Sequence, residues 1–172
     1  MDHMRTLICL ITILFAVSVA AAQEHSESRD FRSDADGFSI KMPDTPKVTS
    51  SDLGEGQTQK IFTVEVGAET YMVSVIQLNP GRVPANPDQA YFDLLMKAYT
   101  DGSKTTLRSS RMVTWAGRPA MEGISDAESA THFIDVTTAG DRIYLVVYAG
   151  PKTQETALKA AHLRDSFKVL SK

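Results

Sequence analysis

The chain has 172 residues, a formal net charge of −3 and 42% apolar residues. This length suits one domain with a short appendage. A mildly acidic chain lacks the basic excess that is typical of nucleic-acid-binding proteins, and its apolar content is too high for an intrinsically disordered chain. We therefore expect a folded protein with no nucleic-acid partner.

The first 22 residues have the three parts of a secretory signal. Arg5 gives a basic start, residues 7–19 form an apolar run, and Ala20 and Ala22 supply the small residues that signal peptidase requires. We predict a signal peptide over residues 1–22, cleavage after Ala22, and a secreted or periplasmic protein with no stable membrane span. The alternative is a retained anchor, but a spanning helix needs about 20 apolar residues, and this run reaches that length only if the alanines are counted.

Cys9 is the only cysteine, and it lies inside the apolar run. A lipid-attachment cysteine would follow that run, because it becomes the first mature residue. The mature chain is therefore expected to lack cysteine, which excludes disulfides, thiol catalysis and zinc–thiolate sites.

The first part of the mature chain is predicted to be a tether followed by strands. Residues 23–36 are polar, with one aromatic residue, and should form a flexible tether. Alternating apolar and polar residues predict strands at 38–42, 57–66 and 70–78. Residues 47–56 are rich in serine and glycine and are expected to form a loop.

The second part is predicted to contain two helices and more strands. Asn86 is a suitable N-cap for a helix that begins at Pro87 and ends near Thr100. The remaining predicted elements are strands at about 105–115, 120–125, 131–138 and 142–149, and a last helix from about 153 to 167 or 170. The almost wholly apolar run from Ile143 to Tyr148 predicts a central strand covered on both faces. Short links between the strands predict an α+β domain in which helices flank an antiparallel sheet.

No catalytic, cofactor-binding or metal site is predicted. His132 and Asp135 are three apart in a strand and should point to opposite faces, while His162 and Asp165 are three apart on a helix, which is typical of a surface contact. Asp34 and Asp36 resemble the start of a calcium loop, but the later ligands are missing. The enzyme hypothesis gains support if at least two of five residues meet in one cleft, and loses it if they scatter. These residues are His132, His162, Asp135, Asp165 and Glu122.

Four basic residues cluster around one predicted strand and its turn, namely Lys104, Arg108, Arg111 and Arg118. A solvated edge strand accounts for them, because charges at sheet edges oppose aggregation. Binding of an anionic partner is the alternative. Arg108 and Arg111 can share a strand face only if a bulge intervenes. Trp115 is expected in the core or at its rim.

Three segments resemble the PsbP-like group of proteins, which includes the Ran-binding Mog proteins and bacterial envelope proteins. They are the opening Gly37–Pro46 segment (GFSIxxPxxP), the turn at 117–122, and the strand at 142–147 followed by Asp165-Ser166-Phe167. The resemblance spans about residues 36–170. It implies a single PsbP-like domain over 37–172, with an antiparallel sheet sandwiched between helices. It also implies binding to other proteins rather than catalysis, and it carries over no ligand residue.

These observations leave three functional hypotheses. The leading one is an exported, non-catalytic binding or accessory module that binds an unknown protein of the cell envelope without a cofactor. The first alternative is a small hydrolase that uses His132 or His162 with nearby acids. The second is a carrier for a small apolar ligand, held in a pocket between sheet and helix.

Overall fold

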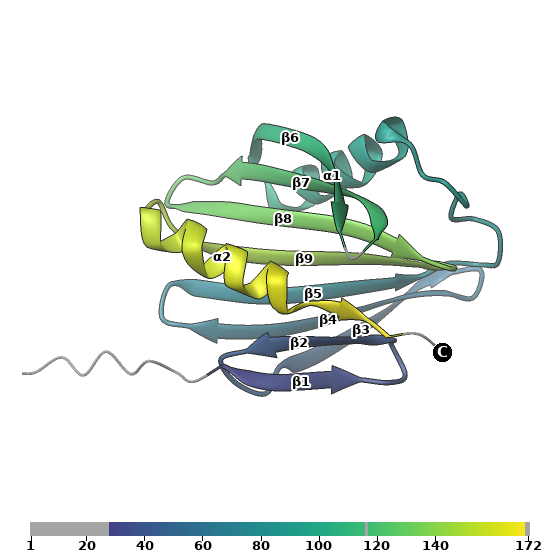
Figure 1. Ribbon diagram of the computed structural model, residues 1–172, viewed down its shortest axis with the longest axis horizontal. Helices are drawn as coiled ribbons and strands as arrows, with labels where there is room; N and C mark the ends of the chain where they lie inside the picture. Colours follow the sequence, from purple (N-terminus) through teal and green to yellow (C-terminus); the bar gives the residue numbers. More distant parts are fainter. Residues whose placement is uncertain (1–27, 116, 171–172) are drawn as a thin grey trace, which may run out of the picture.

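A computed structural model describes residues 28–115 and 117–170 (Figure 1). The predicted signal peptide and residues 23–27 of the predicted tether lie outside this part. The elements are β1 (Arg29–Ser33), β2 (Phe38–Met42), β3 (Lys47–Gly54), β4 (Gln57–Val66), β5 (Glu69–Gln77), α1 (Gln89–Ser103), β6 (Thr106–Trp115), β7 (Arg118–Asp126), β8 (Ala130–Ala139), β9 (Arg142–Pro151), α2 (Gln154–Ser166) and β10 (Lys168–Val169). Neither helix of the described residues is long and apolar enough to cross a bilayer.

The strands form two antiparallel sheets. The larger has seven strands in the order β3-β4-β5-β9-β8-β7-β6, and the smaller has the order β1-β2-β10. β9 is the middle strand, and all of its residues from Ile143 to Tyr148 are buried. Alternate residues of this run belong to two different core clusters. The prediction of a central strand covered on both faces is confirmed, and so is the α+β class with an antiparallel sheet flanked by helices.

The two faces of the large sheet are covered over different strands. On one face, α2 and the small sheet pack mainly against β9 and its neighbours. On the other face, α1 packs against β6, β7 and β8. α2 therefore covers β9 and part of β8, toward the β7 side of the large sheet.

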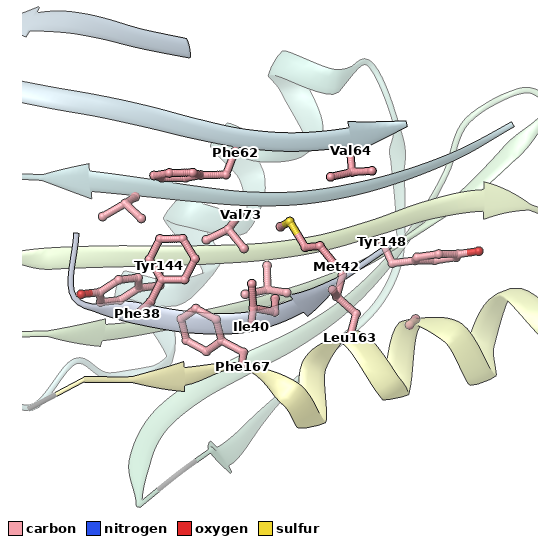
Figure 2. Close-up of a cluster of buried hydrophobic side chains, with 13 residues drawn as sticks. Phe38, Ile40, Met42, Phe62, Val64, Val73, Tyr144, Tyr148, Leu163 and Phe167 are labelled. Atoms are coloured by element: carbon pink, nitrogen blue, oxygen red, sulfur yellow. The ribbon is translucent and has the colours of Figure 1, made fainter. Parts of the chain in front are cut away.

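Aromatic side chains join the two sheets on the α2 side (Figure 2). Phe167, which follows α2, stacks on Phe38 of β2 with 5.8 Å between ring centroids and lies 5.6 Å from Tyr144 of β9. The ring centroid of Trp115 of β6 is 4.9 Å from that of Phe167. Trp115 thus lies at the rim of this core, as expected.

Two segments that we expect to be irregular are strands. Arg29–Ser33, within the predicted tether, pairs with β2, and its Phe31 packs on Phe38 and Phe62 at 5.9 and 5.6 Å between centroids. Lys47–Gly54, within the predicted loop, pairs with β4 as an edge strand whose residues are all exposed. Both predictions are wrong because pairing with a neighbouring strand, rather than a periodic apolar pattern, stabilises these segments.

The predicted ends of the first helix are also corrected. Asp88, not Asn86, is the N-cap of α1, since its side chain accepts a hydrogen bond from the Tyr91 amide. The helix continues to Ser103. It ends there because Lys104 adopts a left-handed conformation, with φ of 54°, and its amide donates to carbonyl groups of the last turn.

Candidate functional site

A hollow of about 200 Å³ lies between α2 and strands β7 and β8. Its walls are mostly apolar and include Ile124, Phe133 and three alanines of α2. Three charged residues, Glu122, Asp135 and Arg164, also line it. Glu122 and Asp135 are direct cross-strand partners, so their side chains are neighbours on the α2 side of the sheet.

A wider hollow of about 540 Å³ adjoins the first. Ile124, Phe133 and Ala157 belong to both. The charged residues of the wider hollow are Arg108, Asp126 and Lys152. We call the two hollows together the α2 groove. The groove has an apolar middle and charged residues toward both ends.

A β-bulge brings two arginines to this face. Register between β6 and β7 shifts between Leu107 and Ser109, which makes Arg108 the extra residue. Arg108 lies 3.4 Å from the Asp126 carboxylate, and Arg111 binds Glu122. The predicted edge position of this strand is confirmed, since β6 ends the sheet. The other two clustered basic residues lie elsewhere, since Lys104 follows the end of α1 and Arg118 begins β7.

Two arginines hold the Glu122 carboxylate. Its Oε1 accepts from Arg164 Nη1 at 2.6 Å, and its Oε2 accepts from Arg111 Nη2 and Nε at 2.6 and 2.8 Å. Arg164 Nε also donates to Asp165 at 3.2 Å. Both oxygens of Glu122 are therefore already engaged in charge-assisted hydrogen bonds.

Asp135 differs from Glu122, because it accepts no hydrogen bond from any residue that the structure describes. Asp135 is only 8% exposed, but its carboxyl oxygens are not fully buried. Because Asp135 lines the hollow, these oxygens reach the space of the hollow. Burial raises the pKa of Asp135 from 3.8 to about 7; Arg164 opposes this shift, and the carboxylates of Glu122 and Asp165 add to it. The hollow thus contains a carboxyl group that changes charge near neutral pH.

Neither of the two histidines in the described part of the chain joins this cluster. His132 points to the α1 side, where its Nδ1 lies 2.7 Å from the Tyr99 hydroxyl. Burial lowers the pKa of His132, with Asp126 opposing the change, and burial raises the pKa of Tyr99 to about 12. His132 and Asp135 therefore point to opposite faces, as their spacing predicts. His162 is exposed on α2.

Of the five residues named for an enzyme, Glu122 and Asp135 meet in the hollow, and Asp165 is linked to them through Arg164. The predicted condition of two residues in one cleft is therefore met by carboxylates alone, without a histidine. Sequence reasoning missed Arg164, because only the packing of α2 on the sheet brings it to Glu122.

The two acidic residues that resemble the start of a calcium loop both have protein partners. Asp36 accepts from Lys60 Nζ at 2.8 Å and from the Ser33 hydroxyl at 2.7 Å, and Asp34 pairs with Arg32. Over residues 28–115 and 117–170 there is no group of three side chains that could hold a metal ion.

Comparison with known proteins identifies the fold. The sequence matches no protein-family model, and no curated protein matches it. Among solved structures, it is similar to cyanobacterial PsbP from Synechocystis sp. PCC 6803, with a TM-score of 0.59 and 13% identity over 89% of this chain and 98% of that one. A protein from Bacteroides thetaiotaomicron has a TM-score of 0.37 and 14% identity over 84% of this chain and 49% of that one, which is too low to support an argument.

The fold is therefore PsbP-like, as the sequence motifs imply. The resemblance to Mog proteins and to bacterial envelope proteins stays a prediction.

Proposed function

We propose that the protein is an exported, non-catalytic accessory module that binds a protein partner of the cell envelope through the α2 groove. The observation that supports this most directly is the unpartnered carboxyl group of Asp135, which reaches the mostly apolar hollow between α2 and the sheet. Buried polar groups are normally hydrogen-bonded, so a group left without a bond at an open hollow is a candidate ligand contact. The secretory signal in the sequence supports the location, and the PsbP-like fold is compatible with a binding module.

The geometry favours binding over hydrolysis. A general base needs a free oxygen within reach of the proton that it removes, whereas both oxygens of Glu122 are held by arginines. Of the two histidines of the hydrolase hypothesis, His132 lies on the opposite face of the sheet and His162 is exposed on α2. Asp135 alone has free oxygens in this hollow, and no serine, threonine, cysteine or histidine among the described lining residues could act with it, which suits recognition of a hydrogen-bond donor.

The apolar-carrier hypothesis expects a pocket between sheet and helix, but it does not expect charged residues in the wall of that pocket. The hollow does lie between sheet and helix, yet Glu122, Asp135 and Arg164 are part of its wall. A purely apolar ligand would cover the Asp135 carboxyl without bonding to it, which costs free energy. A partner that presents a polar group together with apolar surface fits better.

Site-specific photocrosslinking in cells of the native source tests the proposal. A benzophenone amino acid at Ala157, which lines both hollows, should capture a specific envelope protein. The matched control is Leu158, the next residue of α2, which is 59% exposed and lines neither hollow. Equal capture from both positions, or no capture from Ala157 in the folded and exported protein, would contradict binding through the groove.

A further inference from the structure

The charges around Asp135 are balanced except for its own. Three packed elements place charged groups here, namely Arg111 on β6, Glu122 on β7, and Arg164 and Asp165 on α2. The two arginines are matched by the two carboxylates that accept from them. An ionised Asp135 therefore leaves one unpaired negative charge in a mostly buried position.

A carboxylate can only accept hydrogen bonds, so its partner must donate. An anionic ligand would be repelled, and the broad, planar guanidinium would have to fit beside that of Arg164 in a hollow of only about 200 Å³. An ammonium group is more compact and has three donors on a flexible stem. It would both bond to Asp135 and bring the local charge to balance.

The remaining walls suit an alkyl stem. Ile124 and the alanines of α2 can cover methylene groups, and the ring of Phe133 can attract a nearby cation. At about 200 Å³, the hollow is smaller than the pockets of roughly 300 Å³ or more that hold drug-sized ligands. It has room for a short chain rather than for a large cofactor.

We propose that this hollow receives a primary ammonium group on an alkyl chain, which binds to the carboxylate of Asp135. The inference rests on the proposed function and names the chemistry that enters the groove. The group can come from a lysine side chain of a protein partner or from a free alkyl amine.

This binding should depend on pH in a defined direction. Alkyl ammonium groups stay protonated up to about pH 10, so Asp135 is the group that changes charge between pH 5 and 8. Its raised pKa means that it is mostly neutral at pH 5.5 and mostly ionised at pH 8. Affinity should be at least tenfold higher at pH 8 than at pH 5.5.

Nuclear magnetic resonance of the protein without residues 1–22 tests this inference. Butylammonium should shift the amide signals of Ile124 and Phe133 in a saturable way at pH 8, whereas butanol, the neutral analogue of similar size, should not. A blocked Gly-Lys-Gly peptide is titrated in parallel. A response to both amines indicates a lysine side chain, and a response to butylammonium alone indicates a free amine.

Variants give the second readout. Asp135→Asn should abolish the response, while Asp93→Asn, the same change at an exposed position of α1 on the other face of the sheet, should keep the affinity within about threefold. Equal responses to butanol and butylammonium, or no response in the wild-type protein, would overturn the inference, even if a variant failed to fold. Crosslinking from Ala157 in that case would still support the groove as the binding site, for a partner of different chemistry.

Discussion

Asp135 occupies a position in which its charge is costly to the fold. It is 8% exposed and has no hydrogen-bond donor among the described residues, while the adjacent Glu122 takes bonds from two arginines. Two neighbouring carboxyl groups thus lie in opposite environments. Such a difference is typical of positions selected for a ligand contact rather than for stability.

Replacing Asp135 with asparagine should stabilise the protein more as pH rises. The pKa of Asp135 is raised from 3.8 to about 7 in the folded state, so its stabilising contribution is complete below about pH 3.8 and is lost as pH rises through about 7. Asparagine does not ionise. At about 1.4 kcal/mol per pKa unit, the gain of Asp135→Asn over wild type between pH 4 and 8 should be on the order of a few kcal/mol.

Urea unfolding of both proteins at pH 4.5, 6 and 8 measures this difference. Asp93→Asn is the control, because it makes the same substitution at an exposed position of α1, away from the Asp135 cluster. A difference between Asp135→Asn and wild type that does not change with pH would show that Asp135 is not titrating in a buried site.

At the scale of the element, ion pairs at two points tie α2 to the large sheet. Lys159 donates to Glu69 of β5 at 2.6 Å, and Arg164 donates to Glu122 of β7 at 2.6 Å. Burial alone would raise the pKa of Glu69, but hydrogen bonds from Lys159 and Tyr71 outweigh it and lower that pKa. These ties fix the helix that forms one wall of the α2 groove.

Removing the arginine on α2 should cost more than removing the one on β6. Both donate to Glu122, but the Arg164 side chain is 31% exposed and that of Arg111 is 75% exposed. We expect Arg164→Met to lower the free energy of unfolding by about 1 kcal/mol and Arg111→Met by less than about 0.5 kcal/mol. Hydrogen exchange of the α2 amides should rise in the first variant only. The reverse order would show that Arg164 does not hold α2 on the sheet.

The sequence predicts elements well where a segment carries its own pattern. β2, β4, β5 and the buried run of β9 show regular alternation or continuous apolar residues, and both helices show helical spacing. β1 and β3 were not predictable in this way, because an exposed strand with one or two apolar residues has the composition of a loop. The sequence did not distinguish Asn86 from Asp88 as the N-cap of α1, because both side chains can accept the hydrogen bond that an N-cap requires.

The candidate site was only partly predictable. Strand spacing places His132 and Asp135 on opposite faces, which the structure confirms. The bulge at Arg108 has no signal in the alternation of β6, so only the register of the paired strands shows it. Arg164 meets Glu122 through the position of α2, a tertiary contact that no local pattern encodes.

At the scale of the whole molecule, Phe167 connects parts of the chain that are distant in sequence. Its ring lies against Phe38 of the small sheet and Tyr144 of the large sheet (Figure 2). Its centroid is also 4.9 Å from that of Trp115 of β6. Phe167 also follows α2 and precedes β10, which pairs with β2. Residues 167–169 therefore pack and pair with β2, one of the first described strands, in the same core.

Truncating this ring should destabilise the entire domain. Phe167→Ala removes a side chain that is 4% exposed, and we expect a loss of about 3–5 kcal/mol. The only tryptophan of the sequence, Trp115, contacts the ring, so its fluorescence reports both the local change and urea unfolding. Phe167→Leu should lose clearly less. A loss below about 1 kcal/mol for the alanine variant would show that the ring is not central to the core.

Export of the whole molecule is tested by the mass of the mature protein. The small residues before Gln23 predict cleavage after Ala22. Mass spectrometry of the protein from its native source should therefore find Gln23 at the N-terminus. Retention of residues 1–22 would favour the anchor alternative, and an acylated N-terminus would contradict the interpretation of Cys9.

An unpartnered carboxyl group reaches the hollow between α2 and the sheet. The most direct test is an NMR titration of the Asp135 carboxyl carbon in the protein without residues 1–22, with the signal assigned by its loss in Asp135→Asn. We predict a midpoint near pH 7. A midpoint at or below about pH 4, the value of an exposed or well-paired aspartate, would contradict the claim.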